Sequence, residues 1–471
     1  MSDAAILDEA ERLRNDLPGD FSDSIVASLY SDAARITSTS LTQDSQRARL
    51  TVDRALDRAL THRVWGFVVM GVLFFGVFWF TIAGAAGPSG WLMTLLVDNG
   101  HEWLRGLAVG IGAPAWLTGL LVDGVYLGTA WVVAVMLPPM AIFFPLFTLL
   151  EDFGYLPRVA FNLDRLFAKA GAHGKQSLTM MMGYGCNAAG VTSTRIIDSR
   201  RERLIAIITN NFSICNGRWP TLILMGTIFV GALAPPALAG VVAAASVVTV
   251  AFLGVLVTLL VSWGLSKTVL RGQTSVYSLE LPPYRPPQVW RTLYTSLIDR
   301  TLKVLRRAVI MAAPAGAAIW LTSNVAFGDA SVAAHLVGFL EPMGWLLGLN
   351  GVILLAYIVA IPANEIIIPT ILMLTMTLGP NLFGAEGGVM LELGTAQTEA
   401  VLVQAGGWTL LTAVNLMLFS LLHNPCSTTI LTIWNETKSL KWTTVATVLP
   451  LGLGFAVTAM TATTARLLGW V

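Results

Sequence analysis

The sequence predicts an all-α polytopic membrane protein with about seven transmembrane helices and two broken or re-entrant helical segments. Its 471 residues are 55% hydrophobic and only 12% charged, and the mean hydropathy is +0.69, unlike a soluble domain. A bilayer-spanning helix needs about 20 mostly apolar residues. We therefore expect crossings at seven apolar runs: 64–86, 119–150, 204–232, 237–264, 308–327, 407–432 and 443–468.

Two further apolar stretches, 177–196 and 350–377, are interrupted by Gly, Pro and Asn. An unsatisfied backbone group in hydrocarbon costs several kcal/mol, so such breaks occur only where they face protein or a wet cavity. Both stretches are therefore predicted to be broken or re-entrant helices at a transport site.

The distribution of Lys and Arg predicts the orientation, because these residues accumulate in short cytoplasmic loops. Of 29 such residues, eight lie in 1–63, eight in 151–203 and eight in 266–307, whereas 87–118 contains only Arg105. The N-terminus lacks the apolar core of a signal peptide. We expect a multi-pass protein of a prokaryotic inner or plasma membrane, with a cytoplasmic N-terminus.

The chain divides into four expected regions. These are a cytoplasmic arm with a linker helix (1–62), a membrane half (63–265), a basic, Pro-rich cytoplasmic linker (266–307) and a second membrane half (308–471). The charge pattern predicts that the two broken segments enter the membrane from opposite sides, as in transporters with inverted repeats. Aligning GYGCNAAG (183–190) with AIPANEII (360–367) places Asn187 opposite Asn364.

The candidate metal ligands lie at four helix interruptions. Two of these interruptions are the broken segments, and the other two are later breaks at NNFSICNGRWP (210–220) and HNPCSTT (423–429). The predicted ligands are Cys186, Asn187, Cys215, Asn364, Glu365, His423 and Cys426, and further intramembrane polar groups are Asn216 and Arg218. Thiolate, imidazole, carboxylate and amide oxygen together suit Fe(II), Mn(II) or Zn(II) better than Mg(II). Weak ligation is expected of a conduit, because a tightly held ion would not leave.

Each candidate also has a structural interpretation. A lone buried Cys is often a small core residue, and His423 could cap a helix. Glu365 is harder to explain structurally, because a carboxylate at membrane depth costs at least about 2.5 kcal/mol. Arg218 could pair with Glu365 or tether backbone. A disulfide is disfavoured by the odd number of cysteines, and CxxC and HExxH motifs are absent.

Several long motifs in order resemble the membrane domain of the ferrous iron transport protein B (FeoB) family from about residue 25 to the C-terminus. They include LLEDFGYLPRVAFNLDRL (149–166), GYGCN (183–187), CNGRWP (215–220), GVILLAYIVAIPANEIIIP (351–369) and HNPCSTTILTIWNETKSLKWT (423–443). The resemblance implies a ferrous iron importer with two gate-like repeats. It also implies that Cys186, Cys215, Cys426 and Glu365 belong to motifs lining the iron path.

The chain departs from the family pattern in two respects. It contains GCNAA where the family commonly has GCNVP, and CNGRWP where CGAR is common. Family members usually begin with a GTPase domain, but no GxxxxGK[ST] loop is present; GAHGKQS (171–177) has the wrong spacing. We therefore expect no GTP site in this chain and no enzymatic activity. The simplest hypothesis is a separate cytoplasmic G-protein subunit, and the alternative is a carrier that works without a G domain.

The predicted function is Fe²⁺ transport, with Fe²⁺ as the transported substrate, through a Cys-, Asn- and Glu-lined path. The alternatives are a gate-fold transporter of another solute, such as a nucleoside or another divalent metal, and a non-transporting membrane scaffold. Expected partners are membrane lipid, the G-protein subunit and a small FeoA-like protein, but no nucleic acid. Homo-oligomer formation is left open.

Overall fold

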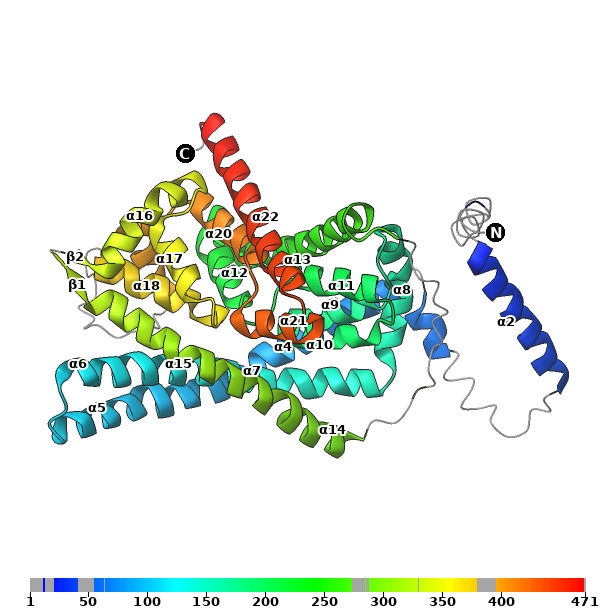
Figure 1. Cartoon of the computed structure of the whole chain (residues 1–471), viewed down its shortest axis with the longest axis horizontal. Coiled ribbons are helices and arrows are strands. Elements are labelled where there is room, and N and C mark those ends of the chain that lie inside the picture. The colour runs from blue at the N-terminus through cyan, green and yellow to red at the C-terminus, as the bar shows by residue number, and fades with distance from the viewer. Residues whose placement is uncertain are drawn as a thin grey trace, which may run out of the picture.

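A computed structural model of the chain describes residues 12, 21–40, 55–62, 64–272, 284, 288–328, 330–378 and 395–469. Within these residues the fold is almost entirely helical (Figure 1). The exception is an antiparallel pair of two-residue strands, β1 (Ala326–Phe327) and β2 (Ala330–Ser331). The predicted all-α polytopic class is confirmed. More than half of the N-terminal arm, and residues 273–283 and 285–287 of the linker, lie outside the described residues.

The part of the chain before the linker contains α-helices joined by short π- and 3-10 turns. Its elements are α2 (Phe21–Ser40), α4 (Trp65–Leu92), η1 (Met93–Asn99), α5 (Gly100–Gly110), α6 (Ala115–Thr118), η2 (Gly119–Tyr126), α7 (Leu127–Asp152), α8 (Tyr155–Lys169), α9 (Gln176–Gly185), α10 (Asn187–Ser193), η3 (Thr194–Ile196), α11 (Arg200–Thr209), η4 (Asn210–Phe212), α12 (Trp219–Met225), η5 (Gly226–Val230), η6 (Gly231–Leu233) and α13 (Pro236–Lys267).

The part from residue 289 onward, which includes the end of the expected linker 266–307, is built in the same way. Its helices are α14 (Val289–Thr295), η7 (Ser296–Leu302), α15 (Lys303–Asn324), α16 (Val332–Leu346), α17 (Gly351–Val359), η8 (Asn364–Ile366), α18 (Ile367–Leu378), α19 (Thr395–Ala400), η9 (Val401–Ala405), α20 (Leu410–Leu422), α21 (Ser427–Thr437) and α22 (Leu440–Leu467).

Six helical segments in the described residues are long and apolar enough to cross a membrane, and a seventh forms if the pair α16 and α17, bent by 110°, counts as one span. The six are Trp65–Gly110, Ala115–Asp152, Pro236–Lys267, Val289–Asn324, Leu410–Thr437 and Leu440–Leu467. The expected crossing at 204–232 is wrong as a continuous helix, because α11 ends at Thr209 and α12 begins at Trp219. Both predicted interruptions occur, at Cys186 and before Asn364.

The continuous helix Trp65–Gly110 has 46 residues and is therefore about 70 Å long, more than twice the thickness of a bilayer core of about 30 Å. Its far end forms a hairpin with α6 and η2, in which His101 Nε2 lies 2.7 Å from the Asp123 carboxylate. This hairpin and α8 lie at opposite ends of the molecule (Figure 1). We call the end with α8 and the Arg-rich start of α11 the basic side.

On the basic side, α8 joins the chain segments that precede α4 and α14. The buried Arg158 donates to Asp57 Oδ1 at 2.9 Å, and its guanidinium lies 4.0 Å from the centre of the Tyr284 ring. Tyr284 donates to the same carboxylate at 2.9 Å, and Asn162 donates to Leu60 O at 2.7 Å. Burial, followed by the Asp57 hydrogen bond, raises the pKa of Tyr284 to about 12, so its hydroxyl stays protonated as a donor. The arm and the linker thus meet on one helix.

An aromatic cluster packs the broken helices against the long ones. Phe74 lies edge-on to Tyr184, with ring centroids 5.4 Å apart, and the Phe78 ring lies 5.7 Å from both Phe143 and Trp219. Such aromatic pairs contribute about 0.5–1.5 kcal/mol each beyond their burial. The cluster links α4, α7, α9 and α12 around the break at Cys186, and it fixes one wall of the site described next.

Candidate functional site

The two predicted broken segments have the same backbone geometry at their breaks. Cys186 is extended, with φ −154° and ψ 119°, and a helix begins at Asn187. Ala363 is extended, with φ −152° and ψ 117°, and helical structure begins at Asn364. The alignment of Asn187 with Asn364 therefore pairs residues in equivalent positions, each the first of a helix after one extended residue. This equivalence supports the internal repeat.

A second pair of breaks packs against the first pair in an equivalent way. The backbone N–H of Asn216, the residue after Cys215, donates to Gly185 O at 3.2 Å. The backbone N–H of Ser427, the residue after Cys426, donates to Ile361 O at 2.8 Å. Interrupted helices need hydrogen-bond partners for their freed backbone groups. In each half, a backbone N–H of the later break donates to a carbonyl oxygen next to the earlier break.

Arg218 connects the two halves at these breaks. Its side chain is fully buried; Nη1 donates to Asn211 O at 2.9 Å and to Leu421 O at 3.0 Å. Nη2 donates to the carbonyl oxygens of His423 and Asn424, both at 3.3 Å. Leu421, His423 and Asn424 lie at the C-terminal end of α20, where carbonyls lack helical partners and the helix dipole favours a cation.

Of the two roles considered for Arg218, the structure shows the backbone tether, not a pairing with Glu365. Asn211 supports the same tether, because it donates from Nδ2 to His423 O at 2.7 Å and accepts from Arg218 Nη2 at 3.1 Å. The breaks at 210–218 and 423–426 are therefore held together through side chains of the first half and carbonyls of the second.

A cavity lies where the four breaks meet, with room for about 40 Å³. Since about 10–15 Å³ is enough for one water, the cavity accepts a few water-sized bodies or a largely dehydrated ion. Seven of the nine predicted polar residues line it: Cys186, Asn187, Cys215, Asn216, Asn364, Glu365 and Cys426. All three cysteines are free thiols.

His423 and Arg218 do not line the cavity. His423 is buried behind it; Nδ1 lies 2.9 Å from Ser420 O and Nε2 lies 3.3 Å from Asn364 Oδ1. Both ring nitrogens thus face protein groups, and His423 orients Asn364, whose Nδ2 in turn lies 3.9 Å from Cys215 Sγ. Within the described ranges, no three His, Cys, Asp or Glu side chains form a ready-made metal site.

The sequence interpretation missed several residues of the cavity wall. Met136 and Met140 of α7 contribute thioethers, and Thr428 and Thr429 of α21 contribute hydroxyls, one of which lies 3.2 Å from Cys426 Sγ. The two methionines are four residues apart around Pro138 and Pro139. That spacing places them on one helix face, a signal available in the sequence.

Gly217 sets the position of the Glu365 carboxylate. A Cβ atom built at Gly217 would lie 2.5 Å from Glu365 Oε1, closer than any real contact. The absence of a side chain at 217 therefore lets the carboxylate approach the CNG backbone beside Cys215. This contact puts an acidic group of the second half against the first half, at the cavity.

The fold and the cavity define a polytopic membrane protein with two gate-like halves around a sulfur- and carboxylate-lined pocket. Residues 133–229 match the Gate family described as nucleoside recognition, and residues 247–299 match the family described as ferrous iron transport protein B C terminus. These two matches assign a similarity to the gate and FeoB C-terminal families, each over less than half of the chain.

Curated relatives agree with this assignment. The chain is 28% identical over 86% of its length to Fe(2+) transporter FeoB of Staphylococcus aureus, of which it covers 58%. It is 27% identical over 85% of its length to FeoB of Synechocystis, covering 61%, and 31% identical over 65% to FeoB of Helicobacter pylori, covering 46%. The chain therefore spans less than two thirds of these relatives. No solved structure matches it.

Replacing Arg218 by Met should lower the free energy of unfolding by at least about 3 kcal/mol, because each buried carbonyl left without a donor costs about 1–3 kcal/mol. Thermal unfolding of the purified protein in detergent measures the loss. Arg291→Met, at an exposed position of α14, is the control and should change stability by about 0.5 kcal/mol or less. A loss in Arg218→Met no larger than the control would contradict the tether.

Proposed function

We propose that this chain is the membrane-embedded path of a ferrous iron transport system. The observation that carries the proposal is the cavity in which both halves present reduced thiols and asparagine side chains, three asparagines in all among the described residues, together with Glu365. Borderline-soft divalent ions such as Fe(II) bind this donor set, whereas Mg(II) and Ca(II) prefer all-oxygen sites. The names of the curated relatives support Fe²⁺ as the substrate.

Entry of Fe²⁺ into the cavity requires the loss of most of its hydration shell, because the space holds only a few water-sized bodies. Glu365 supplies the negative charge that offsets this loss, and its carboxylate oxygens replace water oxygens beside the lining amides of Asn187, Asn216 and Asn364. The thiols of Cys186, Cys215 and Cys426 then add soft donors. Because no three His, Cys, Asp or Glu groups are preassembled in the described residues, ligation stays weak enough for the ion to leave.

The alternative, a nucleoside transporter, has one observation in its favour, the description of the matched Gate family. The cavity argues against it, because a space of about 40 Å³ cannot enclose a base and a sugar. A nucleoside site would also need paired hydrogen-bonding groups and aromatic side chains around a larger pocket. Among the described residues, the observed wall contains five sulfur-bearing side chains and one carboxylate beside three asparagines and two threonines, and none of its lining residues is aromatic.

The same proposal places the N-terminal arm and the partner proteins on the cytoplasmic side of the membrane. The N-terminal arm is on the cytoplasmic side, where α8 holds its end through Arg158 and Asn162. A separate G-protein subunit and a FeoA-like protein would act on this side. A relative from Porphyromonas gingivalis named as a fusion of Fe(2+) transport protein A with FeoB supports the second of these partners.

Substitution of the lining residues tests the proposed path. In cells lacking other iron importers, Cys186→Ser, Cys426→Ser and Glu365→Ala should each lower Fe²⁺ uptake under reducing conditions by at least about tenfold, as loss of metal-site groups typically does. Gly240→Ala, at a helix position with open space around it, is the control and should transport normally. Wild-type uptake by all three variants, at equal expression, would contradict the site assignment.

The two thioethers give a second, milder test. The double variant Met136→Leu, Met140→Leu keeps side-chain volume, so its packing cost is below about 1.5 kcal/mol, but it removes two soft donors from the wall. We expect Fe²⁺ uptake to fall several-fold while the protein remains folded. Met460→Leu, on the exposed face of α22, should leave uptake unchanged. Equal Fe²⁺ uptake by the double variant and this control would show that the two methionine thioethers are not part of the path.

A further inference from the structure

Two short helices lead from the cavity toward the basic side, one from each half. The first, α10, begins directly after Cys186, and the second, α21, begins directly after Cys426. Their first turns line the cavity through Ala188 and Thr428. The segment that follows α10 lies on the basic side, because Lys175 Nζ donates to Ile196 O at 2.9 Å there. The two helices thus run between the cavity and the expected release side.

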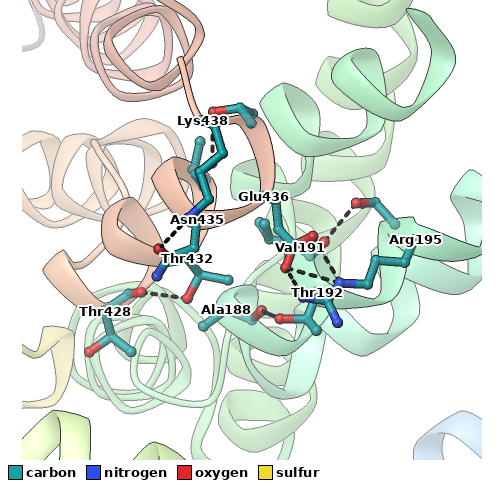
Figure 2. A network of polar contacts seen from close by, with 12 residues as sticks. Ala188, Val191, Thr192, Arg195, Thr428, Thr432, Asn435, Glu436 and Lys438 are labelled. Atoms are coloured by element: carbon teal, nitrogen blue, oxygen red, sulfur yellow. Dashed lines mark hydrogen bonds and ion pairs between the residues drawn. The ribbon is translucent and has the colours of Figure 1, made fainter. Parts of the chain in front are cut away.

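The helices α10 and α21 pack against each other, and each carries small residues, which allow two helices to approach closely. Thr192 donates to Ala188 O at 3.0 Å, and Thr432 donates to Thr428 O at 2.8 Å. Figure 2 shows Ala188 and Thr192 of α10 beside Thr428 and Thr432 of α21. Because each of these two hydroxyls donates within its own helix, neither donates a hydrogen bond across the pair that would have to break when the helices separate.

An ion pair joins the two helices at the ends away from the cavity. Arg195 of η3 donates from Nε and Nη2 to the Glu436 carboxylate at 2.9 and 2.7 Å (Figure 2). The side chain of Glu436 is only 9% exposed, whereas that of Arg195 is 66% exposed. The Glu436 carboxylate is therefore nearly buried on α21. The Arg195 side chain extends to it from the solvent side, across the contact between the two helices.

We propose that the Arg195–Glu436 pair is the latch that closes the release side of the cavity, and that the ion leaves when α10 and α21 separate. The geometry fits such a role, because a bidentate arginine contact is directional. Arg195 is 66% exposed, so its side chain can leave Glu436 for water and the pair can open without unfolding the protein. This inference rests on the proposed transport path for its physiological meaning, but its test needs no iron.

The native cysteines provide the measurement. The chain has three cysteines, and all of them line the cavity, so the rate at which a membrane-impermeant thiol reagent labels the protein reports access to the cavity. In inside-out vesicles, Arg195→Ala and Glu436→Ala should each be labelled several-fold faster than the wild type. The charge-swapped double variant Arg195→Glu, Glu436→Arg should restore the wild-type rate to within twofold.

Two further variants make the result specific. Lys303→Ala breaks an exposed pair with Asp299 inside one helical segment and should be labelled at the wild-type rate. Glu436→Gln keeps the size of the side chain and should be labelled at an intermediate rate. This variant takes the place of Glu436→Ala if Glu436→Ala misfolds. Wild-type labelling of the folded single variants, or no rescue by the charge swap, would overturn the latch. Faster labelling that the charge swap rescues would support the latch even if the protein did not take up Fe²⁺, so failure of the latch and failure of the proposed transport path are distinguishable.

Discussion

The arrangement of the site depends on the burial of Arg218 at the end of α20. A buried guanidinium is costly unless its donors are satisfied, and here the acceptors are carbonyls freed by the break at 423–426. The same interaction therefore gives acceptors to both terminal amino groups of the guanidinium and donors to the interrupted backbone of the other half, whereas Arg218 Nε has no partner among the described residues. Without it, the carbonyls of Leu421 and Asn424 at the break would lose the donor that links them to the first half.

The cavity combines a rigid frame with adaptable ligands. Equivalent extended residues, Cys186 and Ala363, place Asn187 and Asn364 at the starts of helices, and His423 holds Asn364 from behind. The thiols and Glu365 complete the wall without forming a closed ligand set in the described residues. A conduit needs this combination, because selectivity requires the right donors, whereas release requires that they do not close around the ion.

Much of this could be predicted from the sequence, for identifiable reasons. Gly, Pro and Asn inside apolar runs mark helix breaks, so the positions of Cys186 and Asn364 could be inferred. The sequence predicts the break at 210–218 only as a local interruption of the span 204–232, because the apolar residues on both sides give the whole segment the mean hydropathy of a membrane-spanning helix. The direction of His423, which faces Asn364 rather than the cavity, depends on the packing of Phe419 and Tyr357 around its ring. No local pattern encodes that packing. The four-residue spacing of Met136 and Met140 indicates a shared helix face, but it does not indicate that this face borders the cavity.

The central claim is that both halves donate ligands to one Fe²⁺ ion in the cavity. Iron-edge X-ray absorption of the concentrated, anaerobic protein tests it directly, because high concentrations populate a weak site. The account predicts a coordination shell with both sulfur and oxygen or nitrogen neighbours, with the sulfur contribution reduced by Cys186→Ser in the first half and by Cys426→Ser in the second. A shell without sulfur in the wild type would contradict the account.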